Sequence, residues 1–300
     1  MDMTQNKCCR HGANLRRRRR RRRKILRSII FSCSIIAVAV FVAVGSSMIT
    51  SGDGGTNRYD VEAGNNTYDN AVIENSKISG KNKIQNNQSM LDDIMNSTQY
   101  PKQLKDLALK NEEALEFVYD YPAEHVKEHT IDLTEEASMD SVPLFVQWDK
   151  RWGYEKYSGN FFAASGCGPT TLSMVVVYLT HDREASPIAV AKYSKEAGYS
   201  VDGSGSSWTL ISEGCMHYGV KAKAVALDES RMKAELDEGH PIVVNVGPGD
   251  FTDTGHFMVI TGYDDEGFSI NDPNSIEKSG KRWLFKNISS QIRAVWSMYV

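Results

Sequence analysis

The stretch Ala164–Val175, ASGCGPTTLSMV, places a cysteine between two glycines and directly before a helix-like apolar pattern. Pro169 suits the first turn of a helix, where its missing N–H removes no hydrogen bond. The pattern therefore predicts a helix over residues 168–180 that follows Cys167 at once. The unpaired N–H groups and the positive dipole end of a helix N-terminus favour an anion. A thiolate is such an anion, so we expect the pKa of Cys167 to be lowered.

A cysteine nucleophile needs a base that takes its proton. The alternative is that Cys167 is a small buried hydrophobic residue, as most free cysteines are. The chain beyond residue 28 offers six histidines: His125, His129, His181, His217, His240 and His256. His181 lies at the far end of the predicted helix, roughly 20 Å from Cys167 at about 1.5 Å per residue, which is out of reach. His256 opens an apolar strand in GHFMVITGYD. A polar ring at the mouth of a buried strand suits a catalytic base, so we favour His256.

Two neighbouring residues compete to orient His256. The turn Asp264–Gly267, DDEG, predicts a hairpin that brings the end of the next strand back beside the histidine. That strand ends in Asn271 and Asp272, which point to opposite faces of the sheet. Only one of them can therefore share the face of His256.

The register of the hairpin decides between them, since directly opposed residues share a face. If Tyr263 pairs with Gly267, Asp272 lies on the required face. If Tyr263 pairs with Phe268, Asn271 does, and a bulge at Gly267 could shift the register. The sequence leaves both registers open. We favour Asp272 because a carboxylate is the stronger partner for an imidazolium.

An oxyanion needs hydrogen-bond donors as well. The backbone N–H of Cys167, at the helix N-terminus, is one candidate. Gln147, at the end of the predicted strand VPLFVQ, is a candidate for the second. The alternative for Gln147 is an ordinary surface glutamine, and its position leaves both open.

The remaining periodicities predict an α+β domain with an antiparallel sheet, because helices come first and strands second. Helices are expected over residues 101–118, 168–180, 187–197, 207–218 and 229–238. Strands are expected over residues 142–147, 220–226, 241–246, 256–263, 268–272 and 293–299.

The head of the chain differs in charge from the rest. Residues 1–28 carry 12 of the 35 lysines and arginines and one of the 38 acids, so the remainder holds 23 bases against 37 acids. Residues 29–49 contain no charge, and as a helix they would reach roughly 31 Å, the thickness of a bilayer core. We expect a transmembrane helix with a cytoplasmic N-terminus and an extracellular C-terminal part, by the positive-inside rule. A nucleic-acid-binding arm is excluded by the adjacent span, whereas cleavage as a signal peptide stays an alternative.

Beyond the span, residues 50–97 are rich in Asn, Ser, Gly and Asp and are interpreted as a disordered extracellular spacer. Residues 98–300 are expected to fold, with a core over 142–300. Of the five cysteines, only Cys167 and Cys215 belong to this domain, so no disulfide framework is expected. No metal-binding motif is recognised.

The chain resembles the C39-like cysteine peptidases of the papain-like superfamily. The resemblance rests on the segments VPLFVQWDKRWGYEKY, SGCGPTTLSMV, GHFMVITGYD and INDPNS, which occur in the family's order over residues 142–300. It implies a papain-like fold with Cys167 as nucleophile and His256 as base. It also implies Asp272 as the partner of His256 and Gln147 as oxyanion donor.

These observations lead us to expect a membrane-anchored extracellular cysteine peptidase that acts on a peptide or protein and needs no cofactor. The better-known members of the family that the chain resembles are fused to peptide-exporting ABC transporters and cut leader peptides after paired glycines. That specificity is not carried over, because this sequence shows one span and no P-loop. Two alternatives stay open: a cell-wall amidase or endopeptidase with the same triad, and an inactive extracellular module that binds peptides.

Overall fold

The computed structural model describes residues 83–300. The basic head, the apolar segment 29–49 and most of the expected spacer lie outside the described residues. Within residues 83–300, no helix combines the length and apolarity that crossing a membrane requires.

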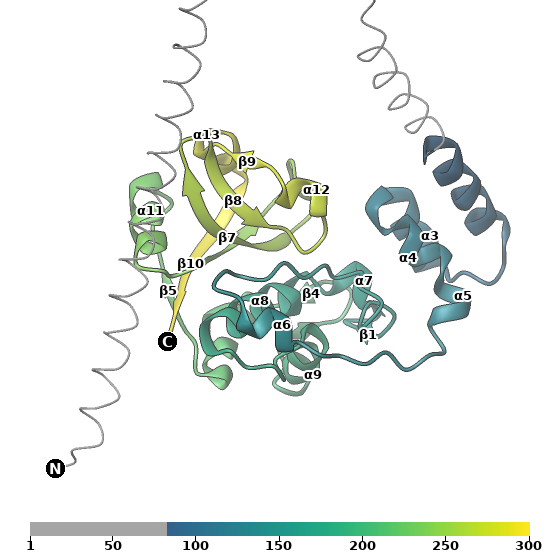
Figure 1. Cartoon of the computed structure of the whole chain (residues 1–300), viewed down its shortest axis with the longest axis horizontal. Helices are drawn as coiled ribbons and strands as arrows, with labels where there is room; N and C mark the ends of the chain where they lie inside the picture. The colour runs from purple at the N-terminus through teal and green to yellow at the C-terminus, as the bar shows by residue number, and fades with distance from the viewer. Residues whose placement is uncertain (1–82) are drawn as a thin grey trace, which may run out of the picture. The chain divides into compact units, whose positions relative to one another are not determined.

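A six-stranded antiparallel sheet forms one layer of the domain, in the order β5-β10-β6-β7-β8-β9 (Figure 1). The apolar runs 220–226, 241–246, 256–263, 268–272 and 293–299 all become strands, as predicted. The strands are β5 (Lys221–Ala224), β6 (Ile242–Val246), β7 (His256–Asp264), β8 (Gly267–Asn271), β9 (Arg282–Trp283) and β10 (Ile292–Tyr299). The prediction of a strand over 142–147 is wrong, because this segment joins no ladder.

The two faces of the sheet bury two different cores, because successive side chains of a strand point to opposite sides. In β7, Phe257 and Val259 belong to one apolar cluster. Met258 and Ile260 belong to the other. The alternation fixes β7 in place, since a slip of one residue would exchange its two faces.

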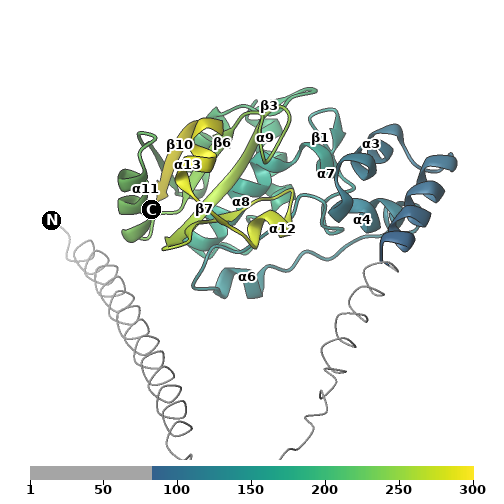
Figure 2. The same ribbon diagram turned by 90° about the horizontal axis from the view of Figure 1, so that it is seen from above.

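Helices cover both faces of the sheet. On one face, α8 (Cys167–Thr180) contacts β7 and also α9 (Pro187–Glu196), whereas α11 (Glu229–Asp237) packs on the other side (Figure 2). These three helices confirm the predicted ones. Every residue of α8 from Gly168 to Tyr178 is buried, so the helix lies inside the domain on all sides. The predicted helix over 207–218 is instead divided into α10 (Thr209–Ser212) and a 3-10 turn, Gly214–Tyr218.

Several short elements were not predicted, because pieces of two to five residues carry no measurable period. They are α6 (Thr134–Ser138), β1 (Lys156–Tyr157), β2 (Asn160–Phe161), α7 (Phe162–Ser165), β3 (Ser200–Val201), β4 (Gly205–Ser206), α12 (Ile276–Ser279), α13 (Phe285–Ile288) and the 3-10 turn Ser289–Gln291. The helix α7 ends two residues before Cys167 and leads directly into α8.

A group of helices precedes the sheet in the sequence. The chain is helical over residues 83–96, so the interpretation of 50–97 as disordered is wrong for this part. Ile94 is fully buried in a third apolar cluster, which also takes Phe161 and Ala163 from the segment before Cys167. The following elements are α3 (Lys102–Lys110), the 3-10 turn Glu112–Ala114, α4 (Leu115–Tyr119) and α5 (Tyr121–Glu124). The single helix predicted over 101–118 is thus interrupted at Asn111, whose backbone is extended.

Candidate active site

Cys167 is the first residue of α8, as the glycine–proline pattern predicted. Its side chain is half-buried. The flanking glycines are required for close packing. A Cβ at Gly166 would lie 2.5 Å from the ring of Phe162, and one at Gly168 would lie 2.5 Å from Ser206 Oγ. The helix N-terminus is therefore held tightly between its neighbours, with the thiol at its first turn.

A bulge in β7 sets the register of the hairpin that follows His256. Near the turn, Tyr263 pairs with Phe268, which alone would leave Asn271 as the neighbour of the histidine. The register then shifts between residues 260 and 262, where Thr261 is the extra residue, and Val259 pairs with Asn271. The predicted bulge thus exists, but it lies in β7 and not at Gly267.

This register brings Asp272 to His256. If the pairing of Val259 with Asn271 is continued by one residue, Asp272 lies opposite Met258. Met258 and His256 lie on the same face of the sheet, so Asp272 shares that face. The His256 Nε2 to Asp272 Oδ1 distance is 2.7 Å, and both side chains are buried. With Nε2 engaged, Nδ1 is the ring nitrogen that remains for Cys167. The structure thus brings Cys167, His256 and Asp272 together.

The three side chains form an electrostatic unit. Burial alone would raise the pKa of Cys167, but a hydrogen bond to His256 and its charge, with the backbone N–H groups of Phe257 and Gly168, lower it below the usual value. Burial alone would lower the pKa of His256, but the charges and hydrogen bonds of Asp272 and Cys167 raise it. Opposite shifts of the two pKa values favour a thiolate beside an imidazolium between them.

Gln147 is buried, which rules out the surface-glutamine interpretation. Its side chain donates from Nε2 to the carbonyl oxygen of Ala163 at 2.7 Å, and its backbone N–H donates to Pro273 O at 2.7 Å. Asn271 holds the same segment, with Nδ2 2.9 Å from Pro143 O. Segment 142–147 therefore crosses the chain on either side of Asp272 and reaches the turn before Cys167. Its backbone groups bind these partners, which explains why it forms no strand.

The chain after Asp272 is held by a residue from the N-terminal helices. The Glu113 carboxylate accepts hydrogen bonds from the backbone N–H groups of Ile276 at 2.8 Å and Glu277 at 3.1 Å. It also accepts one from the hydroxyl of Ser275. Glu113 thus caps the start of α12 (Ile276–Ser279), which begins four residues after Asp272.

Asn111 makes a second contact to the same loop. Its side-chain Nδ2 donates to the backbone and side-chain oxygens of Asn274, at 3.0 and 3.1 Å. The N–H of Asn274 in turn donates to Asp272 Oδ1 at 2.8 Å. The aspartate therefore accepts from both the histidine and this loop, and Asn111, 163 residues earlier in the chain than Asn274, helps to fix the loop.

The other candidate histidines of the described residues have structural partners away from Cys167. His125, His129 and His181 contact backbone oxygens, His217 stacks on Tyr193, and His240 pairs with Glu235. Within residues 83–300, no group of three or more His, Cys, Asp or Glu side chains is arranged to hold a metal ion.

Residues 139–300 match the sequence model of the Peptidase_C39 like family. The chain belongs to this family. It carries a cysteine peptidase-type domain, and the α+β, papain-like fold expected from the resemblance is confirmed. No curated protein matches the chain.

Two solved structures are similar to the C39-like domain. One is the peptidase domain of Streptococcus ComA, a bifunctional ABC transporter involved in a quorum-sensing pathway, with 19% identity and a TM-score of 0.38 over 53% of this chain and 96% of that one. The other is a C39-like peptidase from Bacillus anthracis, with 18% identity and a TM-score of 0.34 over 53% of this chain and 95% of that one.

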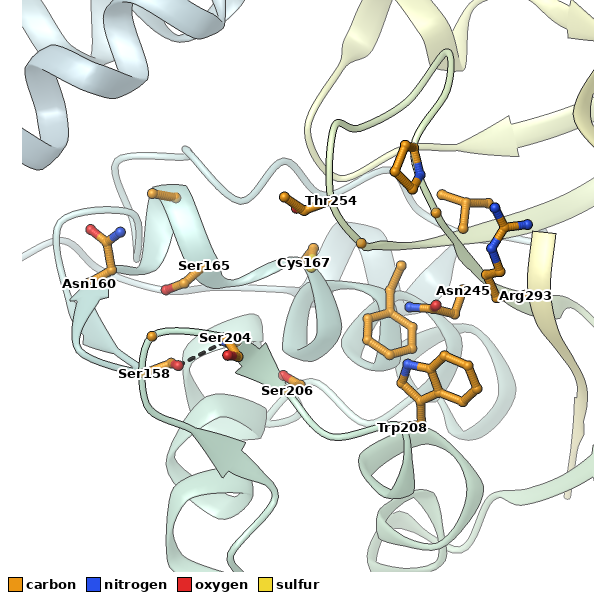
Figure 3. A pocket seen from close by; sticks show the side chains of 18 of the residues that line it. Ser158, Asn160, Ser165, Cys167, Ser204, Ser206, Trp208, Asn245, Thr254 and Arg293 are labelled. Carbon is orange, nitrogen blue, oxygen red and sulfur yellow. Dashed lines mark hydrogen bonds between the residues drawn. The ribbon is translucent and has the colours of Figure 1, made fainter. Parts of the chain in front are cut away.

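A cleft of about 690 Å³ opens beside Cys167 in the C39-like domain (Figure 3). One wall comes from the segment around Ser158 and from β4, and the other from the end of β6 and the start of β7. Ser158 and Ser165 lie on one side of Cys167 in the view, and Asn245 and Arg293 on the other. The thiol is thus reachable from a groove that passes it on both sides.

Sequence reasoning missed the contacts that support the site. Asn111 and Glu113 lie outside the segments that carry the family resemblance, and their partners are about 160 residues away. Arg293 was seen only as the first residue of a predicted strand. No local pattern reports such contacts, because they depend on how distant segments pack.

Proposed function

We propose that this C39-like domain hydrolyses peptide bonds with Cys167 as nucleophile, His256 as base and Asp272 as the residue that orients the base. One observation carries the proposal: the buried hydrogen bond of 2.7 Å between His256 and Asp272 beside a thiol at a helix N-terminus. Nucleophile, base and orienting group in series are what thiol catalysis requires. The opposite shifts of the two pKa values support the same assignment.

The reaction follows from these positions. The thiolate of Cys167 attacks the carbonyl carbon of the scissile amide, and the imidazolium of His256 gives its proton to the leaving amine. The acyl group remains on sulfur as a thioester. A water molecule then attacks the thioester, His256 accepts its proton, and the acid product and free thiol are released.

Two donors would stabilise the oxyanion of each tetrahedral intermediate. The backbone N–H of Cys167 has no carbonyl one turn earlier within α8, because it begins the helix. Gln147 Nε2 carries two hydrogens, of which one is donated to Ala163 O. We assign the second to the oxyanion, where each such donor contributes about 3–4 kcal/mol to the transition state.

The location of the reaction is part of the proposal. The uncharged segment 29–49 and the arginines before it favour a membrane anchor, with the C39-like domain outside the cell. The substrate would then be an extracellular peptide or protein.

A direct test is hydrolysis of a mixed peptide pool by the full-length chain, purified in detergent and read by mass spectrometry. We expect Cys167→Ala to abolish cleavage and Cys215→Ala to retain it. Cys215 is fully buried and has no part in the proposed reaction. Cleavage that survives Cys167→Ala would refute the proposal. Purified cell-wall fragments in the same assay separate a peptidase from a cell-wall amidase or endopeptidase.

A further inference from the structure

The cleft beside Cys167 contains one cationic side chain and no carboxylate. Its walls consist of glycines, serines and other small or uncharged residues, and Arg293 is the one lysine or arginine among them. The sequence outside the basic head has 23 bases and 37 acids. The residues that line the cleft nevertheless include no acid that could neutralise the charge of Arg293.

A bulge turns Arg293 toward the cleft. In the ladder between β10 and β6, Ile292 pairs with Val246 and Ala294 pairs with Asn245, so that Arg293 is the extra residue. Bulges occur beside binding sites because they re-aim a side chain. Gly247 makes room for the result, since a Cβ there would lie 2.8 Å from Arg293 Nε. Two local features thus place the guanidinium over the cleft wall.

The guanidinium of Arg293 has N–H donors that are available to a ligand. Among the described residues, Arg293 Nη1 donates a hydrogen bond to the carbonyl oxygen of Ser290 at 2.7 Å. A guanidinium has five N–H donors. Two of the four other arginines among residues 83–300 are paired with acids: Arg151 with Glu136 and Asp149, and Arg282 with Asp264. Arg293 is exposed and has no such partner among residues 83–300.

The residues around Arg293 suit the part of a peptide-like ligand that lies on one side of the scissile bond. Figure 3 shows Arg293 on the same side of Cys167 as Asn245 and Trp208. Trp208 is 46% exposed and packs edge-on against Trp296, so it offers a fixed apolar surface in the cleft. A ligand that reaches from Cys167 past Trp208 would present its next polar group to the guanidinium.

We propose that the cleft selects amide substrates that carry a carboxylate, and that Arg293 binds this carboxylate while Cys167 attacks the scissile carbonyl. The inference rests on the proposed function and names the substrate class of the same site. Arginine binds carboxylates with two parallel hydrogen bonds, which fixes orientation as well as charge. The carboxylate is an acidic side chain or a chain terminus, and the test distinguishes the two.

The first experiment measures selectivity at Cys167 without requiring turnover. Full-length protein is treated at about pH 6 with iodoacetyl peptides that carry Glu or Gln at one to four residues from the reactive carbon, each with an amidated C-terminus. The thiolate attacks the methylene carbon, a C–S bond forms, the C–I bond breaks and iodide leaves. Labelling of Cys167 is followed by mass spectrometry.

At one position we expect the Glu probe to label Cys167 at least about tenfold faster than the Gln probe, the effect of one hydrogen bond to a charged group. Arg293→Gln should remove this preference and Arg293→Lys should keep part of it. Arg183→Ala is the matched control, because Arg183 is an exposed arginine outside the cleft whose side chain contacts Thr134. Each ratio is measured within one variant, so a change in stability cancels.

The outcomes separate the two proposals. A reactive Cys167 with equal Glu and Gln rates, or with a preference that survives Arg293→Gln, overturns the role of Arg293 and leaves the peptidase intact. A Cys167 that no probe labels in the folded protein overturns the proposed function and this inference with it.

Peptide substrates then identify the source of the carboxylate. Cleavage of matched Glu and Gln peptides is compared with free and with amidated C-termini. An acidic side chain as the source predicts a kcat/KM preference of about ten- to a hundredfold for Glu in both forms. A terminal carboxylate predicts that only the free form is preferred. Equal kcat/KM for all four peptides contradicts the inference.

Discussion

Thr261, the extra residue of the β7 bulge, decides that Asp272 and not its neighbour faces His256. Without the bulge, the pairing of Tyr263 with Phe268 would continue and Asn271 would take the place of the aspartate. With it, Asp272 Oδ1 lies 2.7 Å from His256 Nε2. One inserted residue in a strand thus determines whether the imidazole meets a carboxylate or an amide.

The pH profile of activity should report this carboxylate. Activity requires a thiolate, which is lost below the lowered pKa of Cys167, and an imidazolium, which is lost above the raised pKa of His256. Asp272→Asn removes the charge that raises the pKa of His256, so the basic limb of kcat/KM should move to lower pH. Asp264→Asn, in an exposed pair with Arg282, should leave the limb in place. An unmoved basic limb in Asp272→Asn would show that the carboxylate does not support the base.

The strands, and the residues that they carry, could be predicted from the sequence because β6, β7 and β10 are long apolar runs. The start of β7 gave His256 as a candidate, and the end of β8 gave Asp272. The choice between Asp272 and Asn271 could not be settled, since a bulge depends on the fit of two strands and leaves no pattern at Thr261. The bulge at Arg293 could not be predicted from the sequence for the same reason.

Gln147 should stabilise the oxyanion and not the thiolate. Gln147→Ala should lower kcat by about 10²–10³ if Nε2 donates to the oxyanion. The rate of Cys167 alkylation should stay near that of the wild type, because the thiolate depends on His256 and on the start of α8. An unchanged kcat would exclude the donor role. A parallel fall in alkylation would show that the lost bond to Ala163 O distorts the helix instead.

The contact of Glu113 with α12 should contribute to stability and to activity. Glu113→Ala leaves three donors around Ser275 and Ile276 without their acceptor, and should lower the free energy of unfolding by about 1–2 kcal/mol, as the loss of a helix cap does. Urea unfolding measures this change, with the exposed Glu116→Ala as control. We also expect kcat/KM to fall, because the loop that holds Asp272 loosens. A wild-type urea midpoint in Glu113→Ala would contradict this account of the loop.

The N-terminal helices show where composition misleads. Residues 83–97 belong to the predicted spacer because residues 50–97 as a whole are rich in Asn, Ser, Gly and Asp, yet Ile94 is fully buried against the helices that follow. Burial of a few apolar side chains decided the structure, and a polar average hid them. The partners of Asn111 and Glu113 could not be predicted either, since a hydrogen bond across 163 residues has no local signature in the sequence.

The proposed topology predicts a distinct pattern of protection. Residues 29–49 are proposed to span the membrane, with the arginine-rich head inside and the C39-like domain outside. Protease added to intact cells should release the domain and spare a tag placed at the N-terminus. A domain that resists protease until the cells are lysed would contradict an extracellular location.

The central claim is that Cys167 is a nucleophile activated by His256, and limited alkylation of the folded protein tests it most directly. Cys215 is fully buried, and burial raises its pKa to about 11, so it serves as the internal reference. At about pH 6, mass spectrometry should find iodoacetamide on Cys167 well before Cys215, and His256→Ala should slow the labelling of Cys167 alone. Labelling of Cys167 that is no faster than that of Cys215, or that is unchanged by His256→Ala, would contradict the account.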